Sequence, residues 1–191
     1  MRYSPEHKED TRRRVVQAAG AIAKKQGFGT TGVDGLMGAA GLKGSTFYHH
    51  FATKNDLLEE IIGAELEGMR KQFAGKRNGS KRHLLKQVLA YMSVQHVEEP
   101  ELGCVLPTLS AEVARADENV KKAYEDAVKG IYKDTQEVVG DGNVTWALLA
   151  LSVGAVMMAR AMASEKARDE VLKACGNFAK RTVAALEDDE S

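Results

Sequence analysis

Hydrophobic residues recur along the whole chain at intervals of three and four positions, the spacing that places them on one face of an α-helix. The alternation of apolar and polar residues that is typical of a half-buried β-strand appears nowhere. A first stripe follows Pro5 and stops before Gly27, and two shorter ones lie within residues 33–51. The pattern predicts an all-α fold of about nine helices, the other six over residues 53–73, 81–98, 103–116, 117–139, 143–163 and 165–186.

Residues 30–54 contain two short predicted helices joined by a tight turn. Thr31 and Asp34 have the spacing of a capping box, in which both side chains accept hydrogen bonds from free N–H groups at a helix start. We therefore expect the first short helix to begin near Val33. Gly41 can adopt the left-handed conformation that ends it.

The second short helix is expected over residues 44–50. Phe47 and Phe51 lie four positions apart, so both should point into the core from one face. The other sides then carry hydroxyl, aromatic and imidazole groups, which can meet base edges and phosphates. A helix, a short turn and a second helix form the motif that places the second helix in the major groove of DNA. The alternative is a helical hairpin that only packs.

The candidate DNA contacts lie in this motif and directly after it. Lys54 stands in the first turn of the next helix, which the capping box of Thr53 and Asp56 opens, and free N–H groups at a helix start favour a phosphate. Three arginines at positions 12–14 are either phosphate contacts or solvated charges. The candidate DNA-binding residues are Thr31, Lys43, Gly44, Ser45, Thr46, Tyr48, His49 and Lys54.

The charge distribution agrees with a DNA-binding N-terminal part. The whole chain is formally neutral, but residues 1–54 hold nine Lys or Arg and four Asp or Glu, a balance of +5, which leaves −5 for the remainder. Neutralisation of phosphates supplies much of the affinity of DNA-binding proteins. A basic end on an acidic body therefore favours a protein that binds DNA at one end.

Three sequence runs carry a resemblance to a known family. They are T-x-G-V from Thr30, A-A-G-L from Ala39, and G-S-T-F-Y-H-H-F-x-T-K-x-x-L from Gly44. Over about residues 8–60 the chain resembles the N-terminal DNA-binding domain of TetR-family transcriptional repressors. The resemblance implies a homodimeric, all-helical repressor that a ligand releases from DNA, with Lys54 touching the DNA backbone. Gly35 and Gly38 depart from the helix-favouring or β-branched residues that the family more often has there.

The domain division that we predict has three parts: a DNA-binding domain over 1–54 with its motif at about 32–51, a linking helix and linker over 55–78, and a helical ligand-binding and dimerisation domain over 79–191. The segment 143–163 is apolar nearly all round and rich in small residues, so it must be buried on every side. We expect a homodimer through the last two helices. Two motifs about one helical turn apart, roughly 34–36 Å, would then read a palindromic operator in double-stranded DNA.

Several polar or aromatic side chains interrupt the apolar helices of the larger part, as in pockets for small molecules. Each is either part of a site for a small-molecule inducer of unknown identity or an ordinary core residue. The Gly-Cys element at Cys104 resembles elements of TetR-like repressors that respond to reactive electrophiles, and a helix start favours the thiolate. Its alternative role is that of a small buried hydrophobe. The candidates are Tyr91, His96, Cys104, Tyr124 and Trp146.

Other functional classes lack a signal. The two cysteines are not in a metal-ligand or redox spacing, so neither a metal nor a cofactor is expected. The N-terminus is charged, and the longest uncharged run, which contains residues 143–159, is short for a membrane span, so we expect a cytoplasmic protein without a membrane partner. No Glu-x-x-His pair, phosphate-binding glycine loop or Ser/His/Asp set indicates an enzyme. A helical adaptor, or an enzyme of unknown reaction that kept the fold without binding DNA, is the alternative.

Overall fold

The computed structural model describes residues 5–74 and 80–188. These residues form nine α-helices and two short 3-10 helices, with no strand among them, which confirms the all-α fold. In chain order the elements are α1 (Pro5–Gln26), α2 (Val33–Ala39), η1 (Gly44–His49), α3 (Lys54–Ala74), α4 (Lys81–Tyr91), α5 (Val94–Glu98), η2 (Pro100–Leu102), α6 (Leu106–Val113), α7 (Glu118–Val139), α8 (Gly142–Ala161) and α9 (Glu165–Asp188).

Contacts divide the chain into two compact units. Because α3 and α7 are each long enough to contribute to both, neither unit is a single stretch of sequence. The first unit comprises Met1–Gly68 and Pro100–Ala127, and the second Met69–Glu99 and Val128–Ser191.

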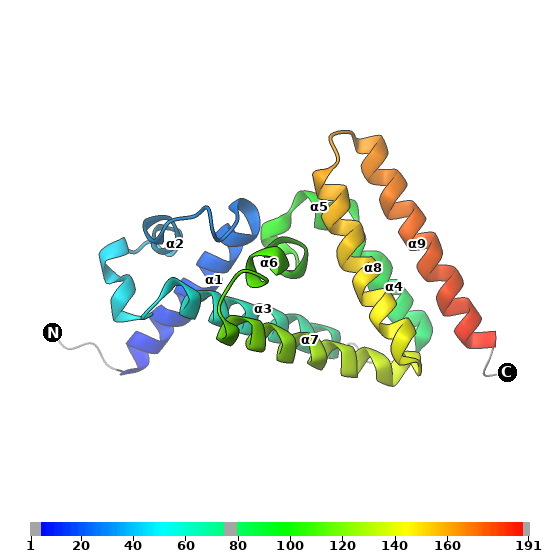
Figure 1. Cartoon of the computed structure of the whole chain (residues 1–191), viewed down its shortest axis with the longest axis horizontal. Coiled ribbons are helices and arrows are strands. Elements are labelled where there is room, and N and C mark those ends of the chain that lie inside the picture. Colours follow the sequence, from blue (N-terminus) through cyan, green and yellow to red (C-terminus); the bar gives the residue numbers. More distant parts are fainter. Residues whose placement is uncertain (1–4, 75–79, 189–191) are drawn as a thin grey trace. The chain divides into compact units, whose positions relative to one another are not determined.

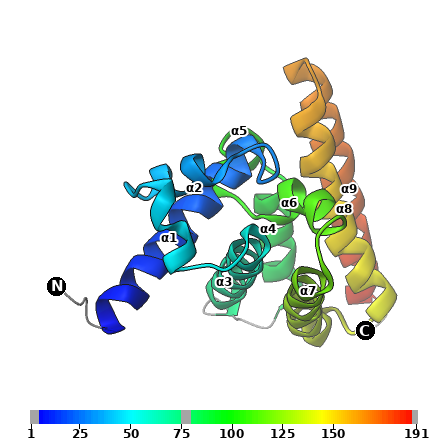
Figure 2. The same ribbon diagram turned by 60° about the vertical axis from the view of Figure 1, so that its left-hand side comes forward.

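In the first unit, α1 packs against α2, η2 and α6, and α2 packs against η1 (Figure 2). Phe47 and Phe51 are buried in its core, as their spacing predicted, and their ring centroids lie 5.4 Å apart. The other large buried side chains come from the apolar stripes of α1, α2 and α3 and include Val15, Leu36, Met37, Leu57, Leu58, Ile61 and Ile62.

In the second unit, α8 packs against α9, α4 and α5, and α9 also packs against α4. A short turn joins α8 to α9, which runs back alongside it (Figure 1). The core of this unit comprises Met92, Val97, Val139, Leu148, Ala155, Val156, Ala159, Leu172, Ala179 and Val183.

The predicted domain boundaries at residues 54 and 78 remain predictions. Residues 75–79, which include the end of the predicted linker, lie outside the described residues. Ser80, just after them, caps α4 by accepting a hydrogen bond from the backbone N–H of His83 at 3.2 Å.

Two helices of the first unit begin at side-chain caps, the first of which the sequence predicted. Thr53 Oγ1 accepts from the backbone N–H of Asp56 at 3.1 Å, and the Asp56 carboxylate accepts from the backbone N–H of Thr53 at 2.9 Å, which completes the capping box. Asp117 Oδ1 accepts from the backbone N–H of Val120 at 3.2 Å and so caps α7.

The helix predicted over 81–98 is wrong as a single element. Met92 leaves the helical conformation at the end of α4, and the Ser93 hydroxyl accepts from the backbone N–H of His96 at 3.2 Å, which starts α5. Met92 and Val97 are both buried in the same core, so the apolar spacing continues across the break and hides it.

Two further boundaries differ from the prediction. The segment predicted as helical over 103–116 is helical only over α6, and Pro107 lies in the first turn. A proline there lacks only an N–H that would be unpaired anyway, so it does not kink the helix. Helix α8 begins at Gly142, before the predicted start at 143, because the carboxylate of Asp141 accepts from the backbone N–H of Val144 at 2.8 Å and caps the helix.

Candidate nucleic-acid interface

The turn between α2 and η1 is set by Gly41. Its φ of +73° is in the left-handed region, which glycine adopts without steric cost. The backbone N–H groups of Gly41 and Leu42 donate to the carbonyls of Gly38 and Met37 at 2.9 and 3.0 Å, the Schellman pattern of a helix end. The expected end of α2 is confirmed, and the chain leaves it through Lys43 into η1.

The start of α2 differs from the expectation. Its N-cap is Gly32, with no side-chain cap, so the capping box of Thr31 and Asp34 is wrong. The Thr31 side chain is buried, and its hydroxyl donates to the carbonyl of Gly27 at 2.7 Å. Thr31 therefore stabilises the turn between α1 and α2, and unlike the exposed candidates its side chain is buried.

The segment predicted as a second helix over 44–50 is a 3-10 helix, η1. It buries Phe47 and exposes the next residue, Tyr48, of which 73% is accessible. Ser45 and His49 are also exposed. Thr46 is half-buried, and its hydroxyl donates to the carbonyl of Lys43 at 2.7 Å.

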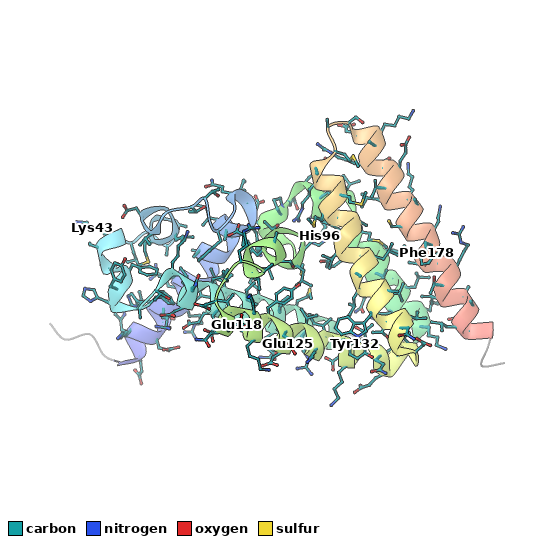
Figure 3. All side chains as sticks on the ribbon, viewed as in Figure 1. Lys43, His96, Glu118, Glu125, Tyr132 and Phe178 are labelled. Atoms are coloured by element: carbon teal, nitrogen blue, oxygen red, sulfur yellow. The ribbon has the colours of Figure 1, made fainter. Side chains whose placement is uncertain are left out.

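Packing against α2 leaves no room for a side chain at Gly44. A Cβ at this position would collide with the Asp34 carboxylate and would lie 3.2 Å from the Asp34 Cα. The absence of a side chain therefore lets η1 approach the first turn of α2. Lys43, just before it, is exposed and projects away from the ribbon (Figure 3).

Arg12 is used inside the first unit. Its Nε donates to the Glu60 carboxylate at 2.9 and 3.0 Å, its guanidinium donates to the carbonyl of His50, and it lies 4.4 Å from the centroid of the Phe51 ring. The hydrogen bonds with Glu60 raise the pKa of Arg12 above its ordinary value. Arg12 therefore ties α1 to α3 and to the end of η1.

The neighbouring arginines are more accessible. Arg13 pairs with Asp10 at 2.7 Å on the exposed side of α1, and Arg14 is exposed. Of the three arginines considered from the sequence, these two are the ones with exposed side chains.

Lys54 is half-buried at the start of α3. Its Nζ donates to the carbonyl of Phe28 at 2.6 Å and lies 4.6 Å from the centroid of the Phe28 ring. Burial lowers the pKa of Lys54, and the charge of Glu112 opposes that shift. Lys54, which was predicted to contact a phosphate, thus also contacts Phe28 within the fold, and the sequence did not show this second contact.

The ligand candidates lie in different units. Tyr91 and His96, in the second unit, are in contact: their ring centroids are 4.4 Å apart, and His96 Nδ1 lies 2.7 Å from the carbonyl oxygen of Tyr91. In the first unit, Tyr124 Oη lies 2.8 Å from Ser110 Oγ. Trp146 stacks on Tyr132 with centroids 4.4 Å apart.

Cys104 is half-buried in the first unit, just before α6. Its Sγ accepts from the backbone N–H of Leu106 at 3.4 Å. The sulfur therefore faces the start of a helix, as the sequence led us to expect.

Two polar residues of the second unit were missed from the sequence. His83 and Gln87 lie one turn apart on α4, and each has a buried nitrogen, Nε2, without a hydrogen-bond partner in the part of the chain that the structure describes. Their spacing of four on an amphipathic helix was the available signal. Over residues 5–74 and 80–188, no group of three or more His, Cys, Asp or Glu side chains could hold a metal ion.

By length and composition alone, α8 is long and apolar enough to cross a membrane. From the sequence, we expected the uncharged run in this helix to be too short for a membrane span. The same properties are found in core helices of soluble proteins. In the second unit α8 packs against three other helices through Leu148, Ala155, Val156 and Ala159.

Comparison with known proteins agrees with the geometry of the motif. The family model of bacterial regulatory proteins, tetR family, matches residues 15–61, which span most of α1, all of α2 and η1, and the start of α3. No curated protein sequence matches the chain.

Solved structures with a similar fold cover nearly the whole chain. A TetR transcriptional regulator from Chloroflexus aurantiacus is 20% identical with a TM-score of 0.73, over 91% of this chain and 96% of that one. The reduced form of E. coli NemR is 19% identical with a TM-score of 0.65, over 90% and 96%. A Saccharomonospora viridis protein in complex with choline is 15% identical with a TM-score of 0.72, over 90% and 96%. Residues 15–61 therefore resemble the tetR family of bacterial regulatory proteins, and the chain shares its all-helical fold with these solved structures.

Proposed function

We propose that the protein is a cytoplasmic, sequence-specific transcriptional repressor that binds a palindromic operator as a homodimer. The observation that carries this proposal is the exposed face of η1, which stands on the buried side chains of Phe47 and Phe51 within the segment that matches the tetR family. Exposed polar side chains on a rigid base meet the requirement for reading base edges.

Within the motif we propose two kinds of contact. Ser45, Thr46, Tyr48 and His49 would meet bases and sugars, with Gly44 allowing close approach. Lys43 and Lys54 would meet phosphates, and Lys54 would do so from the helix start at which it is already held. Thr31 would support the motif from inside, because its hydroxyl is bonded to the end of α1.

The test is binding of the purified protein to a random-sequence duplex during a salt titration, followed by footprinting on the promoter next to the gene. We expect affinity to fall steeply between low and moderate salt, because phosphate contacts release counterions. We also expect protection of an inverted repeat. An adaptor or an enzyme that kept only the fold would show neither result.

The proposed dimer uses α8 and α9. These helices pack together in the second unit (Figure 1). They nevertheless expose several large apolar side chains to solvent. Exposed large apolar groups on neighbouring helices favour burial by another surface, and a second copy of the chain supplies one. The exposed apolar side chains are Trp146, Met157, Met158 and Phe178.

We propose that a small molecule releases the repressor from DNA. The contact between Tyr91 and His96 and the unpartnered nitrogens of His83 and Gln87 in the described chain supply polar groups in the mainly apolar second unit. The choline complex of the S. viridis protein supports a small organic ligand as the general class.

A reactive electrophile that modifies Cys104 is the second candidate for the releasing signal. Cys104 Sγ accepts from the backbone N–H of Leu106 at the start of α6, and a helix start favours a thiolate. The test is release of the protein from DNA by an oxidant, with wild-type protein and the Cys104→Ser variant compared. Equal release of both proteins would exclude Cys104 as the sensor.

A further inference from the structure

One peptide group in the turn after α1 is held at both ends by charged side chains. The backbone N–H of Gly29 donates to Glu112 Oε2 at 2.5 Å, and the carbonyl of the same peptide, that of Phe28, accepts from Lys54 Nζ at 2.6 Å. The backbone N–H of Phe28 also donates to Glu112 Oε1 at 2.8 Å. All four residues belong to the first unit.

The turn leaves room for the Glu112 carboxylate. A Cβ on Gly27 would lie 3.3 Å from Glu112 Oε1, and one on Gly29 would lie 3.4 Å from Oε2. Gly27 also has a φ of +87°, which reverses the chain after α1. A side chain at position 27 would therefore crowd the Glu112 carboxylate, whereas a Cβ at position 29 would only be in ordinary contact with it.

Hydrogen bonds to ionised groups are shorter and stronger than those between neutral groups. Glu112 fixes the amides of Phe28 and Gly29, and the fixed carbonyl of Phe28 then gives Lys54 a defined partner. The Phe28 ring, which is buried, lies beneath the same ammonium group. The position of the Lys54 charge thus depends on a residue 58 positions further along the chain.

We propose that Glu112 is a positioning residue for DNA binding, which holds Lys54 in place through the peptide group between Phe28 and Gly29. The inference rests on the proposed function, in which Lys54 meets a DNA phosphate. Glu112 touches no nucleotide in this arrangement. Helix α6 thereby becomes part of the DNA-binding unit, although its sequence has no feature of a DNA-binding element.

The direction in which DNA affinity changes when Glu112 is substituted distinguishes a positioning role from simple charge repulsion. Removal of an acidic side chain from a DNA-binding protein should strengthen binding to phosphates. We expect the opposite for Glu112→Ala and, to a smaller degree, for Glu112→Gln, which keeps one acceptor oxygen. Glu118→Gln is the matched control, because Glu118 lies on α7 in the same unit, is exposed and pairs with Lys121 on its own helix.

The experiment is a double-mutant cycle on DNA affinity, with full-length protein and a duplex that the wild-type protein selects from a random pool. Glu112→Ala should weaken binding about tenfold, the effect of losing one charge-assisted hydrogen bond. In a Lys54→Met background, the same change should have little further effect, because the charge that Glu112 positions is gone. Exchange of the Phe28 and Gly29 amide protons should accelerate in Glu112→Ala.

Equal losses from Glu112→Ala in the two backgrounds, or unchanged affinity in the wild-type background, would overturn the inference and leave the proposed function standing. If Glu112→Ala does not fold, Glu112→Gln replaces it in the cycle with the same expected pattern. A wild-type protein that selects no duplex would overturn the proposed function and this inference together.

Discussion

Tyr48 lies edge-on against Phe47, with ring centroids 5.2 Å apart and planes at 86°. Phe47 is fully buried, whereas 73% of Tyr48 is exposed. The buried ring therefore restricts an aromatic side chain that solvent alone would leave mobile. A restrained side chain loses less conformational entropy on binding, which makes Tyr48 the residue of η1 best prepared for contact with DNA.

Gly44→Ala should destabilise the protein by about 1–3 kcal/mol, the usual cost of forcing extra volume into a packed site. The added methyl would meet Asp34, including its backbone. Gly38→Ala is the control, because a Cβ there has no neighbour within 4 Å. In the last turn of α2 it should leave the stability unchanged or raise it by up to roughly 1 kcal/mol. Urea unfolding measures both, and a loss of stability in both variants would contradict the assignment of the clash.

Lys24→Ala should destabilise the protein by about 3 kcal/mol, because it leaves a carboxylate and a carbonyl without their buried partner. Lys24 is only 5% exposed, and its Nζ donates to Glu65 at 2.8 Å and to the carbonyl of Gly103 at 3.0 Å. The adjacent Lys25 pairs with Glu101 at the surface. Lys25→Ala should therefore cost less than about 1 kcal/mol. Equal losses of stability for the two variants in thermal or urea unfolding would show that the buried ion pair of Lys24 contributes no more than the surface pair of Lys25.

Acidification should weaken the first unit through His50. Its pKa lies below the ordinary value of 6.5, first because burial disfavours the charged ring and then because Lys8, Arg12 and His49 repel it. The unfolded chain therefore takes up the proton more readily than the folded chain. The stabilisation is complete above about pH 6.5 and is lost as the pH falls toward the pKa of the folded state.

His50→Gln removes this titration. The free energy of unfolding of the variant should depend less on pH than that of the wild type between about pH 7 and pH 5, where an unperturbed histidine titrates. If the free energies of unfolding of the two proteins depend on pH in the same way, the pKa of His50 is the same in the folded and the unfolded chain, and the prediction is wrong.

Phe178→Lys should shift the protein toward the monomer in sedimentation at micromolar concentration. Phe178 on α9 is 49% exposed in the single chain, and burial of a lysine in its place at an interface would be costly (Figure 3). Lys180→Ala, on an exposed position of the same helix, is the control. A wild-type protein that sediments as a monomer would exclude the proposed dimer.

The elements and the core of the motif were predictable because their signals are local. The capping box of Thr53 and Asp56, the left-handed Gly41, and the spacing of Phe47 and Phe51 each involve residues within one turn of each other. The capping box expected at Thr31 failed, since the hydroxyl instead donates to the carbonyl of Gly27, four residues earlier in the turn after α1. The spacing of Thr31 and Asp34 does not show which of two nearby partners the hydroxyl selects.

The rest of the site depends on residues that are distant in sequence. Glu112 reaches the turn at Phe28 across 84 positions, and Arg12 reaches Glu60 across 48. No periodicity or spacing encodes such pairs. For the same reason the sequence did not show that Arg12 is held inside the fold, whereas it did show that Tyr48 would be exposed.

The most direct test is the affinity of the wild type and of a Tyr48→Ala, Lys43→Ala double variant for a duplex that the wild type selects from a random pool. Both side chains are exposed, so the stability of the variant should stay within about 0.5 kcal/mol for each substitution. Its affinity should fall by at least about tenfold, and its salt dependence should become less steep as a phosphate contact is lost. A folded double variant that holds the duplex as tightly as the wild type would mean that the exposed face of η1 does not bind DNA.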